Sequence, residues 1–232
     1  MTEIKSKETQ SKFEWASLAA IACYVGMAAL FVEFIQDTVT NPHGVSAKSK
    51  LVFFIANKIP EWLVSLLGYG SWAVLFVLIG NYCKKAFDLN TKLLPVLAIA
   101  QACLFSGDCM NTDNLSDVEG MKLFIRLFVA SFASLVVMLI VGVKMSITPI
   151  DKKIVVAFIV YPILAMIAML IVLLLSMGES SEKSLLFPYI LGTGAEFLAF
   201  FLISRVFGKM SDEEDSDSES GNKVSETPTN KE

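Results

Sequence analysis

Residues 185–207 read LLFPYILGTGAEFLAFFLISRVF, an apolar run that carries one carboxylate, Glu196, near its middle. As a helix this run is about 34 Å long, enough to cross the roughly 30 Å hydrocarbon core of a bilayer. Glu196 then lies about 16 Å from either end, close to the bilayer midplane. Insertion of an ionisable group at that depth costs about 2.5 to 3.5 kcal/mol, and such a group normally faces a bundle interior or a water-filled cavity. The run therefore predicts a membrane helix with a functional acid.

Similar apolar runs recur along the whole chain. Hydrophobic residues make up 54% of the 232 residues, above the roughly 45 to 50% of soluble domains. We therefore expect an all-α integral membrane protein, a six-transmembrane-helix bundle with both termini cytoplasmic. The predicted helices, which together form one domain over residues 15–207, are 15–35, 62–82, 89–106, 121–143, 154–177 and 185–207.

Polar or short segments flank these helices. Residues 1–14 form a polar N-terminal segment, which we expect to be disordered or interfacial. Residues 46–59 contain five consecutive apolar residues, too few to cross a bilayer, so we place them at the interface, with a re-entrant half-helix as the alternative. The acidic tail, residues 208–232, offers no apolar cluster to bury and is expected to be disordered.

The distribution of basic residues predicts the orientation. With six spans, eleven Lys and Arg residues flank the membrane on the side of the two termini, and five lie on the other side. Basic loops stay in the cytoplasm, so both termini are expected there, in a plasma membrane or a bacterial inner membrane.

Three side chains form the predicted substrate or ion pathway. Gln101 lies at a depth similar to that of Glu196, and Tyr161 precedes Pro162 in the fifth span. A carboxylate removed from water can take up and release a proton or a cation, which is the functional interpretation. The structural alternative is that Glu196 and Gln101 form hydrogen bonds between helices and hold the bundle together.

A second pair of charged residues is predicted nearer the outer membrane boundary. Glu33 in the first span and Arg126 in the fourth lie at matching depth, so they could form a structural ion pair or an outer gate. The pairing predicts that the first and fourth spans touch. On the first span, Ala22, Gly26 and Ala29 share one helical face with Glu33, and small residues on a face indicate close helix packing.

The composition argues against several classes. No cofactor or metal site is expected, because the only histidine is His43 and the four cysteines lack zinc-like spacing. Nucleic acid is not expected as a partner, because the chain without residues 211–232 carries a net charge of only about +2. An enzyme is the least favoured class, and thiol chemistry at Cys103 and Cys109 is its only support. Those two cysteines are interpreted either as a loop disulfide or as inert thiols.

Two functions remain. The first is transport or permeation of a small solute or ion, with proton coupling through Glu196 as one form of it. The alternative is a non-transporting membrane scaffold or accessory subunit that binds another membrane protein, or a second copy of itself, through small-residue helix faces. In both cases the lipid bilayer is the surrounding partner.

Overall fold

The computed structural model describes residues 2–40, 58–89, 91–108, 117–176 and 186–222, which form six α-helices. Five are long and apolar enough to cross a membrane, and the apolar part of the sixth is shorter, at Leu93–Gly107. The all-α prediction is confirmed, and the length and apolar character of the helices indicate a multi-pass membrane protein. The helices are α1 (Thr2–Thr40), α3 (Glu61–Phe87), α4 (Leu93–Asp108), α5 (Asp117–Ser146), α6 (Lys152–Ser176) and α7 (Leu186–Asn222).

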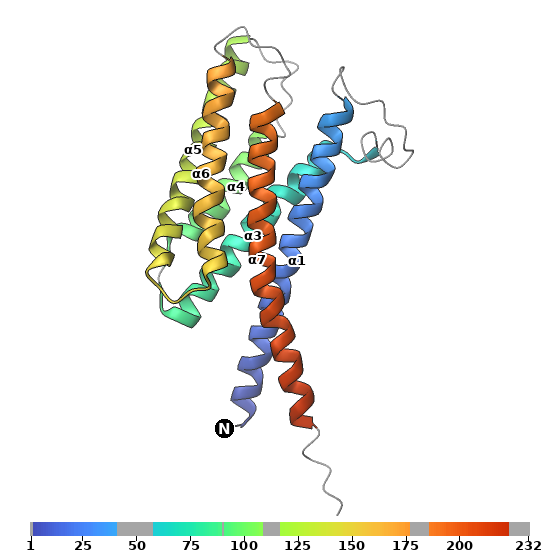
Figure 1. The fold of residues 1–232 in the computed structure, drawn as a ribbon, viewed down its shortest axis with the longest axis vertical. Helices are drawn as coiled ribbons and strands as arrows, with labels where there is room; N and C mark the ends of the chain where they lie inside the picture. The colour runs from blue at the N-terminus through green and yellow to red at the C-terminus, as the bar shows by residue number, and fades with distance from the viewer. Residues whose placement is uncertain (1, 41–57, 90, 109–116, 177–185, 223–232) are drawn as a thin grey trace, which may run out of the picture.

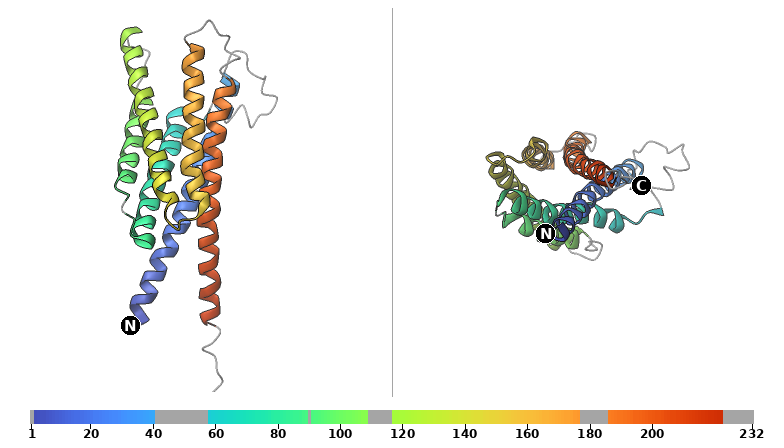
Figure 2. Two further views of the ribbon diagram at one scale, coloured as in Figure 1. Left: turned by 60° about the vertical axis from the view of Figure 1, so that its left-hand side comes forward. Right: turned by 90° about the horizontal axis from the view of Figure 1, so that it is seen from below.

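The helices form a closed ring. Each packs against the next one along the chain, and α7 packs against α1. Successive helices run in opposite directions, so the start of α1 and the end of α7 lie at the same end of the bundle (Figure 1). The view along the bundle in Figure 2 shows the helices around a common centre. We call the end with the α3–α4 and α5–α6 connections the terminal end, since the start of α1 and the end of α7 lie on that side.

The outer surface of the ring is apolar. Large apolar side chains from several helices are exposed, such as Ile21 (56%), Val96 (55%), Val129 (59%) and Leu174 (70%). In water such a surface would be unfavourable, whereas lipid chains solvate it well. The exposed side chains therefore support a membrane environment.

The tightly packed core lies in the half of the bundle nearer the terminal end. Phe76 and Ile79 from the second half of α3, Phe158 from the first half of α6 and Phe200 from α7 are each 2% exposed or less. The small-residue face of α1 packs here. A Cβ atom added to Gly26 would lie 2.5 Å from Cζ of Phe200, so only glycine lets this ring sit against α1. The predicted packing face is thus confirmed.

α5 approaches α6 closely at a carbonyl that Pro162 leaves without its usual helical partner. Pro162 lies inside α6 and has no backbone N–H, so the carbonyl of Phe158, four residues earlier, loses its usual helical partner. Gly142 of α5 packs against this carbonyl, because a Cβ atom built on Gly142 would lie 2.7 Å from Phe158 O. The two helices therefore meet backbone to backbone, as small residues permit in membranes.

The outer helices extend further than the sequence predicted. α1 already begins at Thr2, so the described part of the polar N-terminal segment is helical, and its place at the membrane interface stays a prediction. α7 continues through the acidic stretch to Asn222, so the prediction of a disordered tail is not confirmed, and residues 223–232 lie outside the described residues. The hydroxyls of Ser17 and Ser211, 3.0 Å apart, connect the two extended helices. Most of the predicted interfacial segment 46–59 also lies outside the described residues.

Candidate functional site

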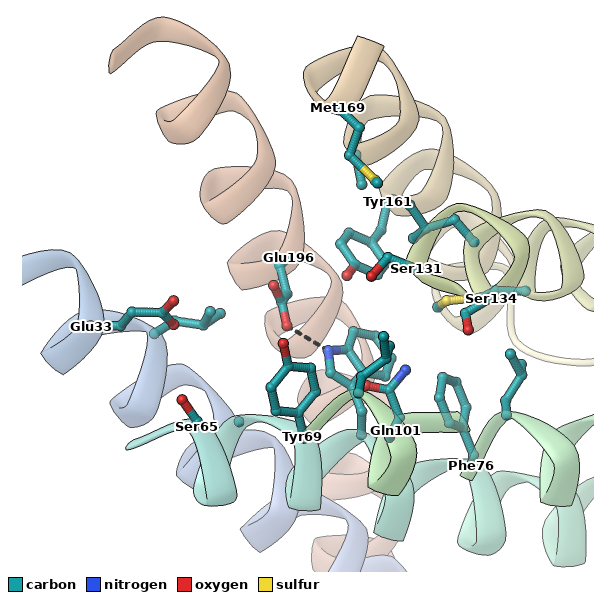
Figure 3. A pocket seen from close by; sticks show the side chains of 18 residues that line it. Glu33, Ser65, Tyr69, Phe76, Gln101, Ser131, Ser134, Tyr161, Met169 and Glu196 are labelled. Atoms are coloured by element: carbon teal, nitrogen blue, oxygen red, sulfur yellow. Dashed lines mark hydrogen bonds between the residues drawn. The ribbon is translucent and has the colours of Figure 1, made fainter. Parts of the chain in front are cut away.

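The ring encloses a cavity of about 270 Å³ in the half of the bundle away from the terminal end. Every one of the six helices contributes to its lining (Figure 3). The space could hold roughly nine water molecules at about 30 Å³ each. Its polar side chains include, one from each helix, Glu33 (α1), Tyr69 (α3), Gln101 (α4), Ser131 (α5), Tyr161 (α6) and Glu196 (α7).

The carboxylate of Glu196 is held in place by a tryptophan. The indole Nε1–H of Trp72 donates a hydrogen bond of 2.6 Å to Oε1 of Glu196. The Trp72 ring is only 3% exposed, and it stacks on Tyr161 at 5.2 Å between ring centroids and lies 4.6 Å from Phe200. Hydrogen bonds to ionised groups are roughly twice as strong as neutral ones. Packing therefore fixes the indole, and the indole fixes one oxygen of the acid.

Several polar groups around the cavity keep unused hydrogen-bonding capacity. Among the described residues, Trp72 is the one hydrogen-bond partner of Glu196, although a carboxylate can accept about four bonds. In the same part of the chain, no side chain or backbone group hydrogen-bonds to the side chains of Gln101, Ser131 or Tyr161. Polar groups at membrane depth normally find partners within the protein. These groups instead face a cavity, where water or a solute can satisfy them.

The cavity is closed towards the terminal end by an aromatic layer, which we define as Trp72, Phe76, Phe158 and Phe200. Trp72 packs on Phe76 at 5.3 Å, and Phe76 meets Phe158 edge to face at 6.0 Å between centroids. Towards the other end the lining reaches Glu33, which is exposed and lies three residues from the end of the apolar stretch Trp15–Gln36. The lining of the cavity thus extends from the aromatic layer to an exposed residue near the opposite end of the bundle.

The structure brings the predicted pathway residues together. Glu196, Gln101 and Tyr161 lie on three different helices and line the same cavity, as does Glu33. Figure 3 shows the Glu196 carboxylate directed towards the space between Tyr69, Tyr161 and Gln101. Residues predicted to lie at a similar depth therefore share one cavity, while the role of each residue stays a prediction.

The predicted contact between the first and fourth spans is wrong for the described residues. α1 packs against α3 and α7 and does not contact α5, which carries Arg126. Arg126 is exposed on α5. The ring order separates the two helices, since α3 and α7 occupy the places beside α1. An ion pair between Glu33 and Arg126 stays a prediction that this arrangement does not favour.

Sequence reasoning missed Trp72, although a signal was present. Trp72 follows Glu61, the first residue of α3, by eleven positions, which places it about 16 Å inside the helix. Tryptophan in membrane proteins concentrates at the two interfaces. A tryptophan at mid-depth must satisfy its N–H inside the protein, so a buried acceptor such as Glu196 was the partner to look for.

Within the described residues, the remaining cysteines and acidic residues do not gather into a second site. Cys103 is an exposed free cysteine, and its predicted partner Cys109 lies outside the described residues. The described part of the chain has no group of three or more His, Cys, Asp or Glu residues that could hold a metal ion. Comparison of the chain with protein-family models, with curated proteins and with solved structures finds no match to any of them.

Proposed function

We propose that this protein moves a small solute or ion across a membrane through the central cavity, with Glu196 as the central binding group. One observation carries the proposal: mid-membrane polar side chains with unused hydrogen-bonding capacity surround a cavity that all six helices build. Gln101 and Tyr161 take part from neighbouring walls. Proton coupling through Glu196 is the form of transport that a single acid at this depth suits best.

The proposed function also requires a particular membrane and a particular orientation of the chain in it. We infer a plasma membrane or bacterial inner membrane, with both termini in the cytoplasm. The excess of basic residues on the terminal side supports this orientation, and it fits the start of α1 and the end of α7, which lie at the same end of the bundle (Figure 1). The cavity would then be accessible from the outer side and closed from the cytoplasm by the aromatic layer.

Transport through this site requires a second arrangement of the helices. The aromatic layer blocks passage towards the terminal end in the described structure, so a solute at Glu196 can leave on that side only if the layer opens. Such alternating access usually comes from one group of helices rocking against another. Phe200 rests on Gly26 of α1, and a shift of α7 along α1 would therefore move one member of the layer.

The scaffold hypothesis receives less support from the packing. It needs small-residue faces that are available to another membrane protein. The best of these, Ala22, Gly26 and Ala29 on α1, is buried within the chain itself, where Gly26 faces α7. The apolar outer surface leaves room for a membrane-protein partner or a homo-oligomer, but such binding does not explain the polar cavity.

A matched pair of glycines on α3 tests the proposal. Gly68 lines the cavity and Gly70 does not, and a Cβ atom at either position meets no atom within 4 Å. Gly68→Leu should fill the cavity, while Gly70→Leu adds the same side chain outside it. The assay is flux of 2-aminoethanol, ethylene glycol and glycolate into proteoliposomes, as cationic, neutral and anionic probes of similar size.

We expect at least one probe to enter wild-type proteoliposomes faster than protein-free vesicles. Gly68→Leu should abolish that flux and Gly70→Leu should retain it. Equal fluxes in the two variants, or no probe entering above the protein-free rate, would remove the cavity as a transport route.

A further inference from the structure

The chemistry of the cavity lining indicates which solute it accepts. Two carboxylates, Glu33 and Glu196, line the cavity, and none of the described lining residues is Lys, Arg or His. A low-dielectric pocket with charges of one sign concentrates ions of the opposite sign. Anions are therefore disfavoured, and a neutral solute would leave the charge of Glu196 without a counterion at a depth where this is costly.

The free hydrogen-bonding groups favour one type of cation. An ammonium group presents three N–H donors and no acceptor. Around Glu196 the cavity offers matching acceptors, namely the carboxylate oxygen not bound by Trp72, the amide oxygen of Gln101 and the hydroxyls of Tyr161 and Ser131. Figure 3 shows Glu196, Gln101 and Tyr161 around a shared space. These acceptors come from four helices, which suits a small donor placed between them.

The volume of the cavity and its aromatic side chains further restrict the class of cation that it accepts. A volume of about 270 Å³ is below the roughly 300 to 1,000 Å³ of pockets for drug-sized ligands. Tyr69, Trp72 and Phe76 also line the space, and the faces of aromatic rings attract organic cations. Strongly hydrated metal ions gain little from such walls, because they prefer oxygen ligands on every side.

We infer that the central cavity binds a small organic cation with a primary ammonium group, held by Glu196, Gln101 and Tyr161. The inference rests on the proposed function for the direction of movement, but binding itself can be tested separately. Ammonium binding satisfies the charge of Glu196 and the free acceptors in one step.

The binding test uses Trp72 as the reporter. The chain has three tryptophans, so a variant with Trp15→Phe and Trp62→Phe keeps only the indole that contacts Glu196. The full-length protein in lipid nanodiscs is titrated with 2-aminoethanol, and Trp72 fluorescence is followed. Ethylene glycol, glycolate, tetramethylammonium and potassium ions serve as neutral, anionic, quaternary and inorganic comparisons.

We expect saturable binding of 2-aminoethanol that is at least about tenfold weaker in Glu196→Gln, because hydrogen bonds to charged groups contribute most. Glu61→Gln, an equal change of charge at an exposed residue outside the cavity, should bind as the parent does. Gln101→Leu provides a second variant in case Glu196→Gln does not fold, and it should weaken binding severalfold. The ammonium assignment is overturned if potassium or tetramethylammonium ions bind as tightly.

The outcomes separate this inference from the proposed function. Binding of 2-aminoethanol without flux in proteoliposomes would support the ammonium site and overturn transport. Flux of ethylene glycol or glycolate that Gly68→Leu blocks and Glu196→Gln does not change would support transport and overturn the ammonium site. If 2-aminoethanol neither binds nor crosses, both proposals fail.

Discussion

The hydrogen bond between Trp72 and Glu196 makes the most quantitative prediction. Trp72→Phe keeps an aromatic ring between Tyr161 and Phe200 but removes the N–H that donates to Oε1 at 2.6 Å. A hydrogen bond to an ionised acceptor contributes about 1.5 to 3 kcal/mol, and a bond between neutral groups about 0.5 to 1.5 kcal/mol. The size of the effect therefore reports both the bond and the charge of the acid.

A double-mutant cycle isolates this bond from the loss of ring volume. Trp72→Phe, Glu196→Leu and the double variant are compared with the wild type by thermal unfolding in detergent, followed by far-UV circular dichroism. We expect a coupling energy of about 1.5 to 3 kcal/mol at neutral pH. For a chain of this size each kcal/mol shifts Tm by about 2 to 4 °C, so the shift is measurable.

The control is Trp62→Phe, the same change on the same helix at a side chain that is 55% exposed. It should leave Tm nearly unchanged. A coupling energy between about 0.5 and 1.5 kcal/mol would show that the acid is neutral. A value near zero would refute the reasoning, because the indole would then not hold the acid.

Three further predictions concern packing and access. Gly142→Ala should destabilise the fold by about 1 to 2 kcal/mol, because the cost of overpacking against α6 exceeds the gain in helix propensity. The control is Gly208→Ala, where a Cβ atom meets nothing within 4 Å; it should not lower Tm. In a cysteine-free background, Ser65→Cys should react with a charged thiol reagent that is added on the side opposite the termini. Ile79→Cys, buried beyond the aromatic layer, should react from neither side. Modification of both cysteines would contradict access to the cavity from one side. Phe200→Ala should lower the free energy of unfolding by about 3 to 5 kcal/mol. It should also make Ser65→Cys reactive from the terminal side. An unchanged pattern of modification would show that the aromatic layer is not the barrier.

The sequence predicts the helices well because hydrocarbon imposes a strict requirement on their length and composition. Each predicted span corresponds to one helix, and Glu196 and Gln101 line one cavity, as their equal depth suggested. Depth, however, says nothing about which helices are neighbours. The predicted contact between the helices of Glu33 and Arg126 failed for this reason, since the ring places α3 and α7 beside α1.

The ends of the helices and the hydrogen bond between Trp72 and Glu196 were harder to predict from the sequence. Hydropathy marks where a helix leaves the hydrocarbon and not where it stops, so the polar extensions of α1 to Thr2 and α7 to Asn222 were missed. α4 begins at Leu93, later than predicted, after a turn in which Leu89 N–H donates to Cys83 O at 3.1 Å. The Trp72–Glu196 bond depends on two helices far apart in the sequence, and such pairing becomes visible only once the ring is known.

The closure of the ring by its first and last members has a consequence for biosynthesis. Among the described helices, every other contact joins consecutive helices, so the growing chain can assemble these walls in the order of their synthesis. The seam between α1 and α7 can form only when synthesis of the last helix is complete. Glu196, an acid that is costly to insert, is therefore made after its tryptophan donor, and a chain truncated before α7 would leave that donor without this acceptor.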